Sequence, residues 1–178
     1  GEYEEVGGMM IDTGTGKDKY QTDPVPEGKP IPVEPEDVEI GDAEYTCTLS
    51  ISCATILDNM DLCNKEKREL VPEDGWLLES VEVSFQEGQS AFDVLQQVCR
   101  ENKLHLEFST TPVYGSAYIE GIGNLYEFDC GAESGWMYAV NGWFPNYGCS
   151  QYALQDGDVI RWRYTCNLGA DVGGSMVA

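Results

Sequence analysis

Residues 134–142 read SGWMYAVNG, and residues 155–166 read QDGDVIRWRYTC. In both stretches large apolar residues occupy every second position, which is typical of a strand with one buried face. Asn141 and Gly142 give a strong signal for a tight hairpin, because both residue types accept positive φ. The Asp-Gly-Asp run at 156–158 predicts another turn before the second strand. Together these residues predict strands joined by tight turns in the last third of the chain.

Upstream residues extend the pattern. Alternation at 44–53 and at 81–85 predicts two further strands. Ser90 and Asp93 form a capping box, so a helix is expected to begin there and to end near Asn102. Its inward face carries apolar residues at helical spacing, namely Phe92, Leu95, Val98 and Cys99. A second helix is expected over 55–68, with an inward face formed by Leu57, Met60 and Cys63.

Short strands are also expected at 104–108, 114–119 and 125–128. The order is strand, strand, helix, then several strands. This order predicts the α+β class, with a β-grasp-like mixed sheet and one principal helix.

Residues 1–43 differ from the rest in composition. They are acidic and contain Pro24, Pro26, Pro30, Pro32 and Pro35, which favour extended backbone. We expect a linker or tether over 1–43, although a tail without a role is equally compatible. The domain is expected over 44–172, with a short tail at 173–178.

The net charge of the protein limits the classes of partner that it is expected to bind. Ten basic and 32 acidic residues give a net charge of −22, which repels nucleic acid and anionic membranes. The sequence contains no apolar run of the ~20 residues that a membrane-spanning helix needs. The acidic start at Gly1 is expected to follow a removed leader or anchor, which predicts a secreted or cell-surface-tethered extracellular protein.

The seven cysteines are scattered, and His105 is the single histidine. Zinc sites draw on close Cys or His pairs, which this spacing lacks, so disulfides in an oxidising compartment are favoured. An odd number leaves at least one thiol outside any intrachain bridge.

Catalytic signatures are missing from the sequence, including Gly-x-Ser-x-Gly, a Gly-rich phosphate loop and His-Glu-x-x-His. A Cys99 and His105 nucleophile pair is rejected, because His105 alternates outward between Leu104 and Leu106. The sequence therefore predicts a binding protein and not an enzyme.

The two opening stretches, with Gly148-Cys149-Ser150 between them, resemble the transcobalamin C-terminal-like domain of many secreted Gram-positive proteins. Residues 79–102 and 118–130 agree, so the resemblance covers about 45–171. It implies a β-grasp fold of the soluble-ligand-binding kind. It also implies cobalamin, or another corrinoid, as the candidate small-molecule ligand.

Aromatic residues are the candidate ligand contacts. Trp143 and Phe144 follow the Asn-Gly turn and Tyr147 lies in the next loop, where rings can stack on a flat ligand. In the resembled carriers the corresponding hairpin region faces the ligand. Trp136 and Tyr138 are weaker candidates, because their strand positions equally suit the core of a small β domain.

Two structural features remain open. The first and last strands of a β-grasp sheet are neighbours, so Cys47 and Cys166 are a candidate disulfide. Acidic residues gather at Asp156, Asp158 and Asp171, but calcium needs six to eight oxygen ligands and no EF-hand spacing is present. Turn chemistry is the favoured interpretation, and any metal site is unknown.

The main alternative function is a structural or adhesive surface module that meets a surface protein, with or without stabilisation by calcium. A ligand module predicts Trp143 and Tyr147 exposed around a concavity. An adhesive module predicts them buried, or spread over a flat apolar patch.

Overall fold

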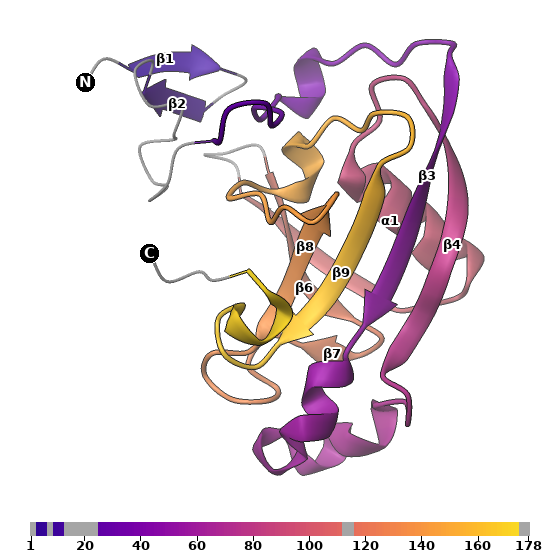
Figure 1. The fold of residues 1–178 in the computed structure, drawn as a ribbon, viewed down its shortest axis with the longest axis vertical. Helices are drawn as coiled ribbons and strands as arrows, with labels where there is room; N and C mark the ends of the chain where they lie inside the picture. Colours follow the sequence, from indigo (N-terminus) through magenta and orange to yellow (C-terminus); the bar gives the residue numbers. More distant parts are fainter. Residues whose placement is uncertain (1–2, 7–8, 13–24, 112–115, 175–178) are drawn as a thin grey trace.

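The computed structural model describes residues 3–6, 9–12, 25–111 and 116–174. Four of their strands form the main sheet, in the order β4-β3-β9-β8. These strands are β3 (Glu44–Ser52), β4 (Trp76–Gln86), β8 (Gly135–Val140) and β9 (Val159–Thr165). The central pair, β3 and β9, is parallel, and each is flanked by an antiparallel neighbour (Figure 1). This β-grasp arrangement confirms the predicted α+β class.

The main sheet has one buried face. Leu49 lies opposite Ile160 and Ile51 opposite Trp162, and all four side chains are at most 2% exposed. Because side chains alternate along a strand, this register places the apolar residues of both central strands on the same side. The core therefore lies against that side, as the alternation predicted.

Helix α1 (Ala91–Glu101) packs on this face and lies behind the sheet in Figure 1. The Ser90 side-chain oxygen accepts a hydrogen bond from the Asp93 backbone at 3.1 Å, and the Asp93 carboxylate accepts one from the Ser90 backbone at 2.8 Å. The predicted capping box is confirmed. Val94, Leu95 and Val98 supply the buried side of the helix.

A smaller sheet contains β5 (Leu106–Thr111), β6 (Ser116–Ile122) and β7 (Leu125–Tyr126), in chain order. Near the start of the chain, β1 (Tyr3–Val6) pairs with β2 (Met9–Asp12) as a hairpin. Three short 3-10 helices complete the secondary structure outside 54–70, namely η1 (Pro35–Asp37), η5 (Cys149–Gln151) and η6 (Ala170–Val172). Residues 112–115 and 175–178, where the strand predicted from 114 begins and the predicted tail ends, lie outside the described residues.

The helix predicted over 55–68 is wrong. That segment forms three 3-10 helices, η2 (Ala54–Asp58), η3 (Met60–Leu62) and η4 (Lys65–Leu70). Asn59 and Asn64 separate them, and the Asn59 side chain donates to the Thr55 carbonyl, which competes with regular helix formation. Cys63 is buried as expected, but Leu57 is 38% exposed and Ile56 takes the inward position.

Residues 25–41, which we call the strap, pack along the domain. The Val33 backbone donates to the Gln151 carbonyl at 2.9 Å, and the Gly41 backbone donates to the Glu87 carbonyl at 2.9 Å. Most of the strap lacks regular structure, as its prolines predict. Over these residues, however, the segment is attached to the domain at both ends and is not a free spacer.

Candidate functional site

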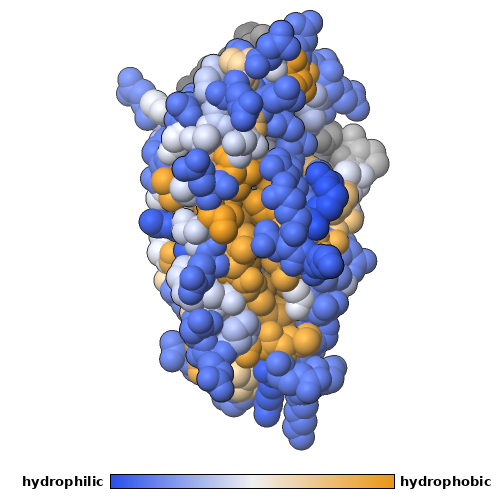
Figure 2. Space-filling view, turned by 90° about the vertical axis from the view of Figure 1, so that its right-hand side faces the viewer, coloured by the Kyte–Doolittle hydropathy of each residue, from blue (hydrophilic) through white to orange (hydrophobic). Residues whose placement is uncertain are grey.

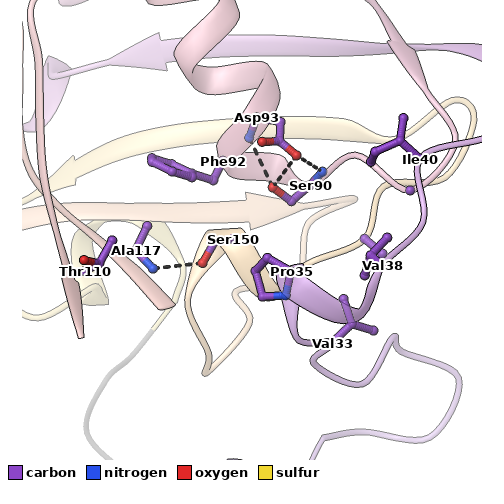
Figure 3. A pocket seen from close by; sticks show the side chains of 12 residues that line it. Val33, Pro35, Val38, Ile40, Ser90, Phe92, Asp93, Thr110, Ala117 and Ser150 are labelled. Atoms are coloured by element: carbon purple, nitrogen blue, oxygen red, sulfur yellow. Dashed lines mark hydrogen bonds between the residues drawn. The ribbon is translucent and has the colours of Figure 1, made fainter. Parts of the chain in front are cut away.

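A pocket of about 270 Å³ lies between the strap and the start of α1. Figure 3 shows strap side chains on one side of it and the first turn of the helix on the other. Its lining is mainly apolar and consists of Val33, Pro35, Val38, Ile40, Gly88, Ser90, Phe92, Asp93, Thr110, Ala117, Ser150 and Ala153. We call this cavity the strap pocket. Its volume is at the small end of typical ligand sites, which run from about 300 to 1,000 Å³.

Hydrogen bonds fix the polar groups of the strap pocket. Asp93 and Ser90 hold each other in the capping box, and the Ser150 hydroxyl accepts from the Ala117 backbone at 2.8 Å (Figure 3). A hydroxyl that accepts one hydrogen bond can still donate its own hydrogen. The pocket therefore offers a few oriented polar groups beside apolar surface.

Carboxylates of the strap place negative charge near the pocket. Burial raises the pKa of Glu34, and the neighbouring charges of Glu36 and Asp37 raise it further. An anionic ligand would meet repulsion from these carboxylates and from the net charge of −22. The site suits a neutral or cationic molecule better than an anion.

Aromatic rings form a second cluster beside the strap. Tyr138 stacks on Trp162 with ring centres 5.3 Å apart, and Tyr147 stacks on Tyr152 at 6.2 Å. The Tyr147 hydroxyl donates to the Pro30 carbonyl of the strap at 2.5 Å. The cluster is therefore packed internally and covered by residues that precede the domain.

The five predicted ligand residues differ in their burial. Trp136 and Tyr138 lie in the core, where the Trp136 ring nitrogen donates to Leu125 and the Tyr138 hydroxyl donates to the Tyr147 carbonyl. Tyr147 is only 7% exposed. Trp143 and Phe144 are partly buried, and they remain candidates for ligand contact.

Lys29 of the strap lies 5.8 Å from the centre of the Trp143 ring, a cation–π distance. A second pocket of about 330 Å³ lies next to this contact. It is lined by Gly28, Lys29, Pro30, Val140, Asn141, Tyr152, Gln155 and Asp158. Polar atoms dominate this lining, so it is a poorer match than the strap pocket to an apolar ligand surface.

The predicted Cys47 and Cys166 disulfide is corrected. The structure does not join these two cysteines, and the parallel register pairs Thr48 with Val159 and Ser52 with Arg163. Cys47 therefore lies beside the start of β9, whereas Cys166 follows its end. The strands are neighbours, as expected, but parallel pairing places these two cysteines toward opposite ends of the sheet.

Three aspartate side chains near the C-terminus accept hydrogen bonds from backbone amides. Asp156 accepts from the Thr46 amide at 3.0 Å, Asp158 from Gln155 at 2.8 Å, and Asp171 from Cys166 at 2.9 Å. These bonds agree with the interpretation as turn chemistry. Within the described parts of the chain, no group of three or more His, Cys, Asp or Glu side chains is arranged to hold a metal ion.

Sequence reasoning missed the strap side of the site, because the segment was expected to be a spacer. A signal was present, since apolar Ile31, Val33, Val38 and Ile40 occur in an otherwise acidic stretch. Helices long and apolar enough to cross a membrane are absent from the described residues.

Comparison with known proteins supports the fold. Residues 88–166 match the family described as "Domain of unknown function (DUF4430)". The crystal structure of haptocorrin in complex with Cbi matches at a TM-score of 0.50 and 14% identity, over 72% of this chain and 26% of the haptocorrin chain. The chain thus spans about a quarter of that protein, and the likeness shows a shared fold.

A Ruminococcus gnavus ATCC 29149 protein, provisionally described as metal binding, matches at a TM-score of 0.40 and 16% identity. The match covers 68% of this chain and 96% of that protein. No curated protein sequence matches the chain.

Proposed function

We propose that the chain is a ligand-binding module and that the strap pocket holds part of a small molecule. The observation that carries this proposal is the apolar wall of the strap, set beside polar groups that hydrogen bonds hold in place. Sites for small molecules combine apolar surface with a few oriented polar groups. Binding is proposed over catalysis because Asp93, the acid in the lining, is engaged in the cap of α1.

The candidate ligand is a corrinoid such as cobalamin. The fold shared with haptocorrin supports this choice, and the carboxylates of the strap favour a neutral or cationic molecule over an anion. A corrinoid carries amide side chains around its ring, and the pocket has room for one edge or one side arm. The proposed location is extracellular, either secreted or tethered to the cell surface, in line with the acidic surface and the cysteine content.

Calorimetric titration of the chain with cobalamin and with cobinamide tests the proposal. We expect saturable binding in the micromolar range or tighter. Ile40→Ser should weaken it by at least about threefold, because this 52% exposed side chain forms part of the pocket wall. Ile31→Ser is the matched control, since Ile31 is a similarly exposed strap isoleucine outside the lining.

Trp143→Ala separates the strap pocket from the aromatic cluster. Binding that survives this change but is weakened by Ile40→Ser locates the ligand at the strap pocket. Binding that is lost in Trp143→Ala alone transfers the site to the aromatic loop. Absence of corrinoid binding at high micromolar concentration rejects the corrinoid, and absence of binding across a small-molecule panel rejects the ligand function.

A second candidate function is an adhesive surface module that meets another protein through a sheet edge. Two observations favour it: Tyr147 is buried, and β4 is an edge strand with no neighbour on its outer side among the described strands. Figure 2 shows apolar surface running down the side of the molecule that carries β4 and α1. Leu77 and Val81 of β4 are partly buried apolar residues, as is Leu104, which follows α1.

The partner chemistry for this edge follows from its charge. Glu79 and Glu82 are exposed on β4, and a second copy of the chain would carry the same net charge of −22. An extended partner strand with alternating apolar and basic residues fits better. A synthetic alternating Lys-Val peptide should shift the β4 amide signals in NMR spectra, and Val81→Lys should abolish the shift. Unchanged β4 signals would reject this function.

A further inference from the structure

Four of the seven cysteines gather at one end of the main sheet. They come from separate segments: Cys53 follows β3, Cys63 lies between η3 and η4, Cys130 follows β7, and Cys166 follows β9. All four are buried. The other three, Cys47, Cys99 and Cys149, lie elsewhere in the core.

Flanking residues bring Cys63 and Cys130 together. The Asn64 backbone donates to the Asp129 carbonyl at 2.8 Å, and the Asn64 side chain donates to the Asp129 carboxylate at 3.1 Å. Each cysteine is the direct chain neighbour of one member of this pair. Lys67 reinforces the junction, with its ammonium 3.5 Å from the Asp129 carboxylate.

Strand register brings Cys53 and Cys166 to the same junction. β3 and β9 are parallel neighbours that pair Ser52 with Arg163, and both cysteines continue the inward-facing rows of their strands. Thr55 connects the ends of the two strands, because its hydroxyl donates to the Tyr164 carbonyl at 2.5 Å and lies 3.9 Å from the Cys166 sulfur.

Within the cluster Cys130 is the thiol whose pKa responds to two others, because Cys166 and Cys63 both contribute to its shift. The hydrogen bond with Cys130 lowers the pKa of Cys166, whereas the same interaction and burial raise the pKa of Cys130. Cys166 is also 8% exposed, more than any of the other six cysteines. Its lowered pKa and its exposure make Cys166 the thiol best placed to react with a disulfide from solution.

We propose that this junction of four thiols is a disulfide site. Because Cys130 and Cys166 act most strongly on each other, they form one bridge, which leaves Cys53 and Cys63 as the second pair. In the first step the Cys166 thiolate attacks a low-molecular-weight disulfide such as oxidised glutathione and releases one thiolate. The Cys130 thiol gives its proton to that thiolate and attacks the Cys166 sulfur, which releases a second thiolate. This thiolate takes up the proton that Cys166 lost to solvent when it ionised. Two protein thiols become one bridge while the small disulfide becomes two thiols, so atoms and electrons balance. The same exchange joins Cys53 to Cys63.

These bridges would fasten 54–70, which lacks an α-helix, to the end of the sheet. They would also account for the odd cysteine number, because Cys47, Cys99 and Cys149 remain buried thiols. These three lie in other parts of the core, away from the four clustered thiols.

The test is disulfide mapping of the full chain after refolding in a glutathione redox buffer. Free thiols are alkylated under denaturing conditions, and peptides are then identified by mass spectrometry without reduction. We expect a mass lower by four hydrogen atoms, three alkylated cysteines, and peptides that link Cys130 to Cys166 and Cys53 to Cys63. Seven alkylated cysteines, bridges to Cys47, Cys99 or Cys149, or metal retained by the four thiols would each overturn the proposal.

A stability comparison gives a second readout. Reductant should lower the melting temperature of the natural chain, and it should lower that of Cys99→Ser by a similar amount. The double variant Cys130→Ser, Cys166→Ser should lose the part of this sensitivity that the Cys130–Cys166 bridge contributes, and it should keep the part that comes from Cys53 and Cys63. Equal sensitivity in all three proteins would contradict the assignment of Cys130 and Cys166.

Discussion

Tyr147 illustrates how the strap changes the role of a single residue. Sequence patterns place its ring on a loop, where exposure is the natural expectation, but the Pro30 carbonyl accepts its hydroxyl and the ring stacks on Tyr152. Trp136 and Tyr138 could be placed on a strand from alternation alone. Their burial depends on what covers that strand, which periodicity does not reveal.

Replacing Tyr147 with Phe removes the hydrogen bond to the strap and keeps the stacked ring. We expect the free energy of unfolding to fall by about 1 kcal/mol, because the Pro30 carbonyl loses its partner. Urea unfolding measures this change, and protease cleavage within residues 25–41 should become faster. Tyr118→Phe is the control, since that hydroxyl contacts Glu127 on a ring that is 49% exposed, and it should change stability less. Equal effects would show that Tyr147 does not anchor the strap.

At the scale of elements, α1 was the most predictable part of the chain. Ser90 and Asp93 define the start of the helix through hydrogen bonds between residues close in sequence, so this start can be predicted without knowledge of the tertiary structure. The helix predicted within segment 54–70 was wrong for the opposite reason, because the structure there depends on tertiary packing. Its apolar spacing matched a helix, but Asn59 and Asn64 interrupt the backbone pattern, and the burial of Ile56 and Cys63 follows from packing.

Ser90→Ala tests the cap. We expect a loss of about 1 kcal/mol in the free energy of unfolding, because the first turn of α1 loses its side-chain acceptor. Urea denaturation followed by circular dichroism gives the value. Ser109→Ala, at an exposed strand position, serves as control and should change stability by less than about 0.5 kcal/mol. A neutral Ser90→Ala would mean that the cap contributes little to the folded state.

Gly75 tests the connection between β3 and β4. Its φ is +77°, and a Cβ atom there would lie 2.5 Å from the Ala54 Cα, so Gly75→Ala combines backbone strain with a clash. We expect a loss of at least about 2 kcal/mol. Gly157 has a φ of +85° and open space around it, so Gly157→Ala should cost only about 1 kcal/mol of strain. Chemical denaturation should show a larger loss of stability for Gly75→Ala than for Gly157→Ala. The reverse order would contradict the described connection between β3 and β4.

At the scale of the whole molecule, the resemblance predicted the sheet with its first and last strands as neighbours. It did not specify which ends of these strands meet. The parallel pairing of β3 with β9 separates Cys47 from Cys166, and only this register shows the separation. The strap escaped prediction because Val33 and Ile40 become pocket lining only when α1 and β6 lie opposite them.

Buried phenols and thiols predict loss of stability in alkali. Burial raises the pKa of Tyr152 to about 12, and burial also raises the pKa of Cys47 to about 12. Tyr138 is shifted in the same direction by complete burial. In the unfolded chain these groups lose protons at lower pH, so the native state binds more protons and stability falls as pH rises toward 12. Urea titrations between pH 8 and about 11 should show this decline, and constant stability would contradict the burial of these side chains.

The central claim is that the strap pocket holds a ligand, and amide chemical-shift mapping with cobinamide tests its location most directly. The account predicts saturable shifts in three places: strap residues 33–40, the start of α1, and residues 150–153. The shifts should be reduced in Ile40→Ser and retained in Ile31→Ser. Shifts confined to the neighbourhood of Trp143, or no shifts at saturating cobinamide, would contradict the assignment of this pocket.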